Sequence, residues 1–155
     1  MRTLNTNSTF GEATPGMTAT TGAENARKSV QTEVDEAKKT LVIYSPDLNF
    51  CFSLSMVFQD RYNVVTTTSL TTLEKSVAHY TADLLVVDAD PSEKMIQRID
   101  RLRESNRGIP VILLYVYNAR EGTLDRAVRS HVDSVFYKPV EINAVSRRID
   151  ELLAV

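Results

Sequence analysis

The stretch from Asp83 to Pro91, which reads DLLVVDADP, constrains the fold more than any other part of the sequence. Its four aliphatic residues at 84–87 follow one another without polar alternation, and such a short run is typical of a central parallel strand buried on both faces. The run ends at Asp88. In an open α/β sheet, functional groups gather just beyond the carboxyl ends of the strands. The pattern therefore predicts that Asp88 lies at a functional edge of a parallel sheet.

The residues that follow Asp88 are expected to begin a helix. Asp90, Pro91 and Glu93 fit the residue preferences at the N-cap, in the first turn and at the third helical position. We therefore interpret Asp90 as a structural cap. The role of Asp88 depends on which other side chains reach the same edge of the sheet.

Composition favours one globular domain and argues against several classes of partner. The 155 residues are 43% hydrophobic and carry a formal net charge of −2, so we expect neither nucleic acid nor a membrane surface as a direct partner. The single cysteine, Cys51, has no internal disulfide partner and is expected to be a core thiol. No apolar run of about 20 residues and no signal-peptide pattern occurs, which predicts a cytoplasmic protein.

Residues 1–38 differ in composition from the rest of the chain. They hold three of the five glycines, many Thr, Asn, Ser and Ala residues, and few large apolar side chains. Such a segment buries too little apolar surface to offset its conformational entropy. We therefore predict a disordered N-terminal tail over 1–38 and a folded domain over 39–155.

From residue 40 onward, short aliphatic or β-branched runs alternate with segments of helical periodicity. Five such strand–helix units predict an α/β fold, with a doubly wound, parallel five-stranded sheet between two layers of helices. Asp47 is expected to cap the first helix, and Thr71 with Glu74 the second. The expected strands are 41–44, 62–68, 84–88, 111–116 and 135–137, and the apolar positions of the helices are Phe50, Leu54, Val57, Phe58, Leu70, Leu73, Val77, Met95, Ile99, Leu102, Leu124, Ala127, Val128, Ile142, Val145, Ile149 and Leu152.

Three motifs stand in order at strand ends: DLLVVD ending at Asp88, PVILL over 110–114, and Lys138-Pro139 after the fifth strand. Each motif is weak alone. Together, at this spacing, they resemble a response-regulator receiver domain over residues 40–155. This is the CheY-like, flavodoxin-like module of two-component signalling, with strand order 2-1-3-4-5.

The resemblance implies a phosphoacceptor at Asp88, a Mg²⁺ ion held by an acidic pair after the first strand, and a lysine paired with the aspartate. Lys138 matches this lysine, and we expect its side chain to lie within ion-pair or one-water distance of Asp88. The acidic pair is missing, because its position falls on residues 44–45 (YS) or 45–46 (SP), depending on the register. Asp47 lies one or two residues late. Asp88 and Asp47 are therefore weak candidate metal ligands, and Mg²⁺ binding is expected to be weak.

The two switch positions that the resemblance implies are also altered. Tyr115 stands where the family has a small Thr or Ser, and Val135 stands where it has a rotating Tyr or Phe. Tyr115, Tyr117 and Tyr137 fall near strand ends on the family's usual contact face, which the fourth and fifth strands and their helices form. Because tyrosines are favoured in interfaces, we expect this face to bind a partner or to form a homodimer. For Tyr115 a second interpretation stays open, in which it plugs the pocket that a phosphate would occupy.

These features predict a stand-alone, atypical receiver domain that is not an enzyme and that acts by protein–protein contact in phosphorelay signalling. The missing acids favour a pseudo-receiver with a degenerate site. The alternative is a working phosphoacceptor, modified at Asp88 by a histidine kinase or phosphotransfer protein. The expected partners are such proteins or a downstream effector. A remote alternative is a haloacid-dehalogenase-type phosphatase, whose nucleophile motif Asp88-Ala89-Asp90 also resembles.

Overall fold

A computed structural model describes residues 37–154 of the chain. The predicted tail, residues 1–38, lies almost entirely outside the described residues. The described chain forms a five-stranded parallel sheet in the order β2-β1-β3-β4-β5, which confirms the predicted fold class and strand order. The elements are β1 (Thr40–Tyr44), α2 (Leu48–Phe58), β2 (Asn63–Thr67), α3 (Leu70–His79), β3 (Leu84–Asp88), α4 (Glu93–Ser105), β4 (Val111–Tyr115), the 3-10 helix η1 (Ala119–Glu121), α5 (Gly122–Val128), β5 (Ser134–Tyr137) and α6 (Ile142–Leu153).

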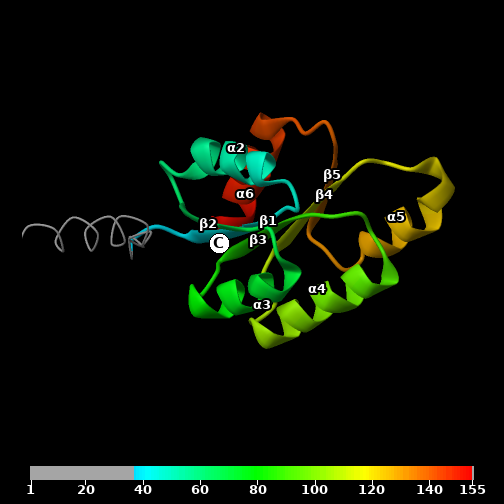
Figure 1. Ribbon diagram of the computed structural model, residues 1–155, viewed down its shortest axis with the longest axis horizontal. Coiled ribbons are helices and arrows are strands. Elements are labelled where there is room, and N and C mark those ends of the chain that lie inside the picture. Colours follow the sequence, from blue (N-terminus) through cyan, green and yellow to red (C-terminus); the bar gives the residue numbers. More distant parts are fainter. Residues whose placement is uncertain (1–36, 155) are drawn as a thin grey trace, which may run out of the picture. The chain divides into compact units, whose positions relative to one another are not determined.

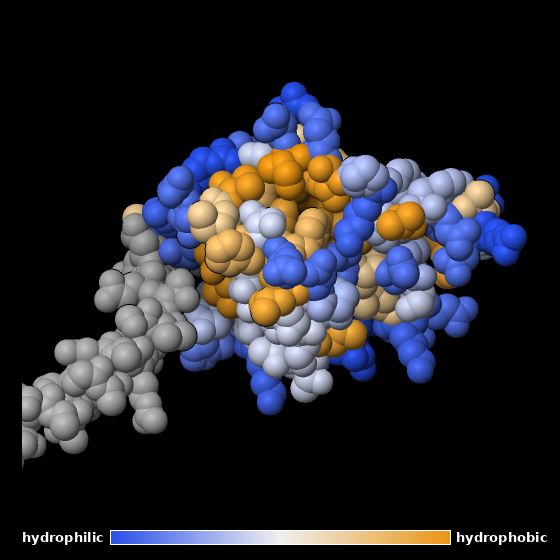
Figure 2. Space-filling view, turned by 45° about the horizontal axis from the view of Figure 1, so that its top comes forward, coloured by the Kyte–Doolittle hydropathy of each residue, from blue (hydrophilic) through white to orange (hydrophobic). Residues whose placement is uncertain are grey.

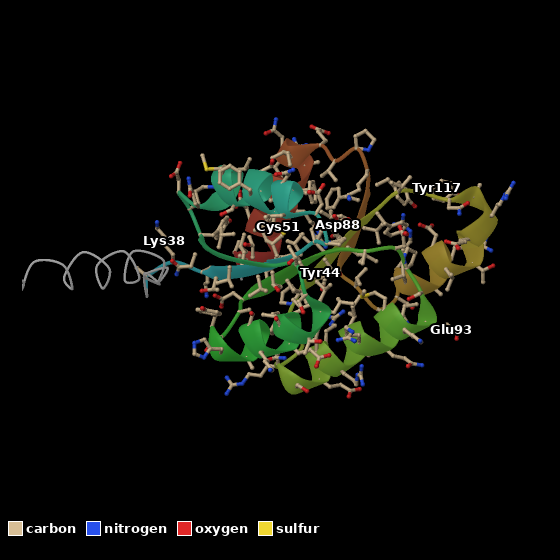
Figure 3. All side chains as sticks on the ribbon, viewed as in Figure 1. Lys38, Tyr44, Cys51, Asp88, Glu93 and Tyr117 are labelled. Carbon is tan, nitrogen blue, oxygen red and sulfur yellow. The ribbon has the colours of Figure 1, made fainter. Side chains whose placement is uncertain are left out.

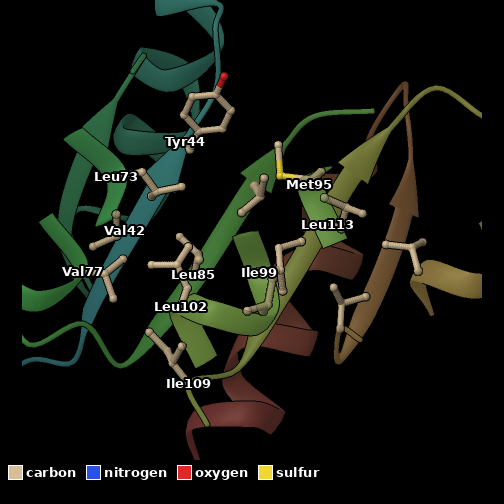
Figure 4. Close-up of a cluster of buried hydrophobic side chains, with 14 of the residues drawn as sticks. Val42, Tyr44, Leu73, Val77, Leu85, Met95, Ile99, Leu102, Ile109 and Leu113 are labelled. Carbon is tan, nitrogen blue, oxygen red and sulfur yellow. The ribbon is translucent and has the colours of Figure 1, made fainter. Parts of the chain in front are cut away.

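Two hydrophobic cores lie on opposite faces of the sheet, because successive strand residues point to opposite faces. Helices α2 and α6 cover one face, and α3 and α4 cover the other, where α5 also contributes Val128 (Figure 1). Figure 4 shows the second of these cores, where Leu73 and Val77 of α3 and Ile99 of α4 pack on Val42 and Leu85. The three-layer arrangement is therefore as predicted.

The strand register brings three chain segments to the same edge of the sheet. Tyr44 at the end of β1 pairs with Val87 of β3. The residues that come next, Ser45 and Asp88, therefore stand at the carboxyl end of the two strands. On the other side of β3, β4 and β5 end together, because Tyr115 pairs with Tyr137. The residue after β1, the last residue of β3 and the residue after β5 therefore lie at the same edge of the sheet, although they are far apart in the sequence.

Side-chain caps set where the helices begin. Asp47 caps α2 as predicted, since its carboxylate accepts hydrogen bonds from the backbone N–H groups of the first turn. The predicted Thr71–Glu74 capping box is wrong. Helix α3 begins at Leu70, and the hydroxyl of the extended residue Ser69 accepts from the Thr72 amide.

The predicted cap of α4 is also wrong, because the helix begins later than expected. Ser92 has extended backbone angles, and its hydroxyl accepts a hydrogen bond from the Met95 amide at 3.1 Å. Asp90 and Pro91 therefore precede the helix instead of forming its first turn. A serine directly before the first helical residue can accept from one of the free N–H groups of the first turn, and here Ser92 takes the place predicted for Asp90.

Two residues predicted for the apolar faces of helices are exposed. Val57 on α2 and Ala127 on α5 both point to solvent, whereas Leu54, Phe58 and Val128 are buried as predicted. Helix α2 is apolar on nearly all sides, so the sequence period alone does not identify the face that meets the sheet. No helix within residues 37–154 is both long and apolar enough to cross a membrane.

Candidate functional site

Asp88 lies at the carboxyl edge of the sheet (Figure 3). It forms an ion pair there with Lys138. Asp88 ends β3, and its side chain is 8% exposed. Lys138 follows β5 directly, and its backbone N–H donates to the Tyr115 carbonyl, which fixes the start of the loop. The lysine Nζ lies 2.6 Å from Oδ1 of Asp88, past the end of β4. The predicted ion-pair distance is confirmed.

Ser45 holds the second oxygen of the Asp88 carboxylate. The buried Ser45 hydroxyl donates to Oδ2 of Asp88 at 2.6 Å, and the same hydroxyl accepts from the Asp47 amide at 3.0 Å. The Ser45 amide donates to the Thr67 carbonyl, which anchors this residue to the end of β2. Each carboxylate oxygen of Asp88 therefore has one protein donor, a cation on one side and a neutral hydroxyl on the other.

Tyr44 belongs to the opposite side of β1 from Ser45. Its ring packs in the core shared with α3 and α4 (Figure 4). Burial, and to a lesser extent the nearby Asp88 carboxylate, raise the pKa of its phenol, so this residue stays protonated at neutral pH. Of the residues at the two possible acidic-pair registers, Ser45 is the one whose side chain contacts Asp88.

The donor set at this edge does not fit a Mg²⁺ site. Asp47, the second weak metal candidate, is exposed and uses Oδ1 to cap α2, with the Asn49 amide at 2.9 Å and the Phe50 amide at 3.3 Å. Within residues 37–154 no three His, Cys, Asp or Glu side chains are grouped closely enough to hold a metal ion. Mg²⁺ prefers carboxylate and water oxygens, and here Lys138 already neutralises the Asp88 carboxylate.

The first turns of α2 close the site from the other side. The Lys138 ammonium lies 4.7 Å from the ring centroid of Phe50, within the range of a cation–π contact. Cys51 is buried with its Sγ 3.6 Å from the Ser45 carbonyl, and burial raises the pKa of its thiol. Cys51 is therefore a protonated core thiol, as predicted, and not a nucleophile of this site.

A second polar cluster lies beside the first, at the ends of β4 and β5. It consists of Tyr115, Asp125, Arg129 and Tyr137, and we name it the tyrosine–aspartate network. The Tyr115 and Tyr137 hydroxyls both donate to Oδ1 of the buried Asp125, the latter at 2.7 Å. Arg129 Nε lies 3.5 Å from Oδ2 of Asp125, and the guanidinium also donates to the Tyr137 hydroxyl at 2.5 Å. The two strand ends are thereby tied to α5.

The network favours a charged Asp125. The Tyr115 hydrogen bond is the largest influence that holds the pKa of the Asp125 carboxyl below its ordinary value, and Tyr137 and Arg129 add to it. Burial, followed by the hydrogen bond to Asp125, raises the pKa of the Tyr115 phenol. A protonated phenol and an ionised carboxylate are thus the stable pair at neutral pH.

The interface interpretation of Tyr115 is wrong for this structure, because the side chain is 2% exposed. Its hydroxyl is bonded to α5. Tyr117 is half exposed, and its ring packs at a tilt against that of Tyr137, with a centroid distance of 5.2 Å. Both rings are exposed at the predicted surface. Val135, at the other switch position, packs against the core of the α3–α4 face.

Sequence reasoning missed Asp125. An aspartate in a short helix ordinarily indicates a solvated residue, and no local pattern marks this one as buried. A signal was nevertheless present in the predicted strand ends. If Tyr115 and Tyr137 end adjacent strands and are partly buried, their hydroxyls need an acceptor, and a residue of the intervening helix is well placed to supply it.

No protein-family model and no curated protein matches the chain. Solved structures with the same fold include a two-component response regulator from Clostridium difficile, with 14% identity, a TM-score of 0.65, and coverage of 76% of this chain and 97% of that one. The BeF3-activated receiver domain of DrrB has 18% identity, a TM-score of 0.64, and coverage of 76% and 99%. A pilus assembly-related protein from Burkholderia pseudomallei has 22% identity, a TM-score of 0.63, and coverage of 77% and 92%.

At these identities the likeness is one of fold. Residues 37–154 have the flavodoxin-like fold of response-regulator receiver domains, as the sequence motifs predicted.

Proposed function

We propose that this protein is a receiver-type signalling domain that acts through protein–protein contact while Asp88 stays unphosphorylated. The observation that carries the proposal is the hydrogen bond from Ser45 to Asp88. A neutral hydroxyl holds the carboxylate oxygen at the place where the resembling family carries metal-binding acids. The domain is then a pseudo-receiver, recognised in one constitutive state.

Electrostatics supports this proposal. Transfer of a phosphoryl group to a carboxylate brings two negative groups together, so catalysis depends on positive charge that neutralises the phosphoryl oxygens. Lys138 is the one cation bonded to Asp88, and its charge is already balanced by that carboxylate. The Ser45 hydroxyl adds no charge. The site therefore lacks the excess positive charge that would draw a phosphoryl donor.

The tyrosine–aspartate network supports a fixed state of the contact face. In the resembling family, a small hydroxyl after the fourth strand follows the phosphate. Here Tyr115 occupies that position, and its hydroxyl donates a hydrogen bond to Asp125 on α5. A rearrangement of this strand end would break a hydrogen bond to a buried carboxylate, which is costly. We infer that the ends of β4 and β5 hold one arrangement.

Partners of this state are expected at the exposed part of the same face. Val116, Tyr117 and Tyr137 present apolar or aromatic surface there, with a polar tip on each tyrosine. A histidine kinase, a phosphotransfer protein or a downstream effector is the expected class of partner. Binding would not depend on phosphorylation.

The second candidate function is that of a working phosphoacceptor. The retained pair of Asp88 and Lys138, with its 2.6 Å contact, favours it, because the same two groups serve phosphorylation in the resembling family. No further step of phosphoryl transfer can be assigned to residues of this edge, since a metal-binding acid is missing.

Intact-mass measurement after incubation with acetyl phosphate and Mg²⁺ separates the two functions. The pseudo-receiver shows no added phosphoryl group, and its spectrum matches that of Asp88→Asn treated in the same way. A double variant, Ser45→Asp with Pro46→Asp, serves as the control in which acids are restored. A phosphoryl adduct on the unmodified chain that is lost in Asp88→Asn would overturn the proposal.

A further inference from the structure

Helix α2 exposes a continuous apolar surface. Leu48, Phe52, Met56 and Val57, which we name the α2 face, are 70%, 66%, 53% and 47% exposed. They are four of the seven large apolar side chains that are exposed within residues 37–154. Figure 2 shows apolar side chains gathered on the side of the domain that carries α2 and α6. The opposite side of α2, with Cys51, Leu54 and Phe58, fills the core, so the α2 face has no packing role within the domain.

The α2 face is also free of charge. Helix α2 reads LNFCFSLSMVF and is the one described α-helix without a charged side chain. A solvated helix ordinarily carries charged residues on its outer side, as α4 does with EKMIQRIDRLRES. Exposed apolar patches without charge mark contact sites in soluble proteins.

We propose that the α2 face is the contact between two copies of this chain. A two-fold contact places the same patch on both sides, so it suits a surface that has no like charges to bring together. Leu48, Phe52 and Met56 follow at intervals of four residues and form one ridge along the helix. Two such ridges interdigitate when the helices cross at about −50°. Phe52, at the centre of the ridge, then lies nearest the two-fold axis.

The area fits a dimer that forms and dissociates. The four exposed fractions correspond to on the order of 400 Å² of apolar surface per copy, which is within the size of a functional patch. Two copies bury roughly twice this area, and polar residues at the rim add to it, which places the contact at the low end of specific interfaces at about 1,200 Å². The dimer is therefore expected to dissociate on dilution.

This contact differs from the predicted face of β4, β5 and their helices. That face carries the exposed Arg120, Arg126 and Arg129 together with the exposed Glu121, so a two-fold contact there has to remove charged side chains from water. The α2 face carries no charged side chain. The inference goes beyond the proposed function and does not depend on the phosphorylation state of Asp88.

Sedimentation equilibrium of the full chain tests the proposal. The unmodified protein should move from the mass of one chain to that of two as its concentration rises. Phe52→Glu should weaken this association at least about tenfold, because it places like charges at the centre of the contact. Val116→Glu is the matched control, because Val116 is an apolar residue of similar exposure on the β4–β5 face, and it should leave the dimer unchanged. A monomer at every concentration, or a dimer that Val116→Glu breaks and Phe52→Glu does not, overturns the proposal.

Disulfide trapping checks the geometry independently. Phe52→Cys should form a covalent dimer under mild oxidation, since the two copies of this residue meet near the axis, whereas the exposed Glu104→Cys should not.

Methionine oxidation identifies any other occupant of the α2 face. A monomer with Met56 protected would mean that residues 1–36 cover the face, and a monomer with Met56 reactive would leave it for a different protein. Either result contradicts self-association through α2.

Discussion

The Ser45 hydroxyl donates a 2.6 Å hydrogen bond to the Asp88 oxygen that does not contact Lys138. The resemblance to receiver domains implies a metal-bound acid at this place. The serine side chain stabilises the carboxylate without adding charge. Its contribution to stability is therefore measurable apart from any phosphorylation.

Ser45→Ala should lower the free energy of unfolding by about 1–3 kcal/mol, because it leaves a buried carboxylate oxygen without its donor. Urea denaturation of the full chain gives this value. Ser53→Ala is the control, since the exposed Ser53 bonds only to a carbonyl of its own helix, and its effect should stay within about 0.5 kcal/mol. Equal losses of unfolding free energy for the two variants would show that the Ser45–Asp88 hydrogen bond contributes no more to stability than an exposed one.

Restoring acids should create a metal site. The unmodified protein should show no rise in melting temperature at millimolar Mg²⁺, whereas the Ser45→Asp, Pro46→Asp variant should rise, because a ligand of the native state stabilises it in proportion to RT ln(1 + [L]/Kd). Tyr44→Asp with Ser45→Asp tests the other register. Saturable stabilisation of the unmodified chain below about 1 mM Mg²⁺ would mean that Asp47 or Asp90 completes a site after all.

Asp88 and Lys138 should behave as a coupled pair. Lys138→Met should cost about 2 kcal/mol, less than the 3–5 kcal/mol of a fully buried pair, because the lysine side chain is 29% exposed. With Asp88→Asn added, the double variant should lose less than the sum of the single losses, since no unpaired buried charge remains. Denaturation of the four proteins in this cycle gives the coupling energy. Strict additivity would argue against the ion pair.

Tyr115→Phe should destabilise the protein by about 1–2 kcal/mol at neutral pH and make it less sensitive to acid. The folded-state pKa of Asp125 lies below its ordinary value. Its stabilisation is therefore complete above the unfolded pKa of about 3.9 and is lost as pH falls through the folded value. Without the Tyr115 bond this loss shrinks.

Unfolding free energies measured between about pH 2 and pH 6 test this prediction. Tyr137→Phe is the matched comparison. Tyr137 donates to the same carboxylate oxygen but is 38% exposed, so its removal should cost less at neutral pH. An acid dependence that is unchanged in Tyr115→Phe would remove Tyr115 as the main cause of the lowered Asp125 pKa.

The strand order and the Asp88–Lys138 pair were predictable because buried parallel strands leave a strong local signature. An uninterrupted aliphatic run fixes where a strand ends, and parallel strands bring their carboxyl ends to one edge. The sequence placed residues 44–46 near Asp88 but left two registers open, and the structure shows that Ser45 makes the contact. A resemblance carried by three short motifs was sufficient for this part of the fold.

Helix boundaries and helix faces were less predictable, for separate physical reasons. Several Ser, Thr and Asp residues near a helix start can serve as its N-cap. Which one does so depends on backbone angles that tertiary packing sets, as at Ser69 and Ser92. In α2, where apolar residues occur on all sides, periodicity does not distinguish the exposed Val57 from the buried Phe58. The burial of Asp125 depends on two tyrosines from other strands, which no local pattern reveals.

The central proposal has two parts. Ser45 and Lys138 occupy the two carboxylate oxygens of Asp88, and the tyrosine–aspartate network holds the ends of β4 and β5 in one conformation. The most direct test is to record backbone amide NMR spectra of the full chain before and after addition of Mg²⁺ and beryllium fluoride. BeF3 activates the DrrB receiver domain, which has the same fold. The resonances of Ala89, Tyr115 and Asp125 should not move. Saturable shifts of these resonances that are abolished in Asp88→Asn would contradict the proposal.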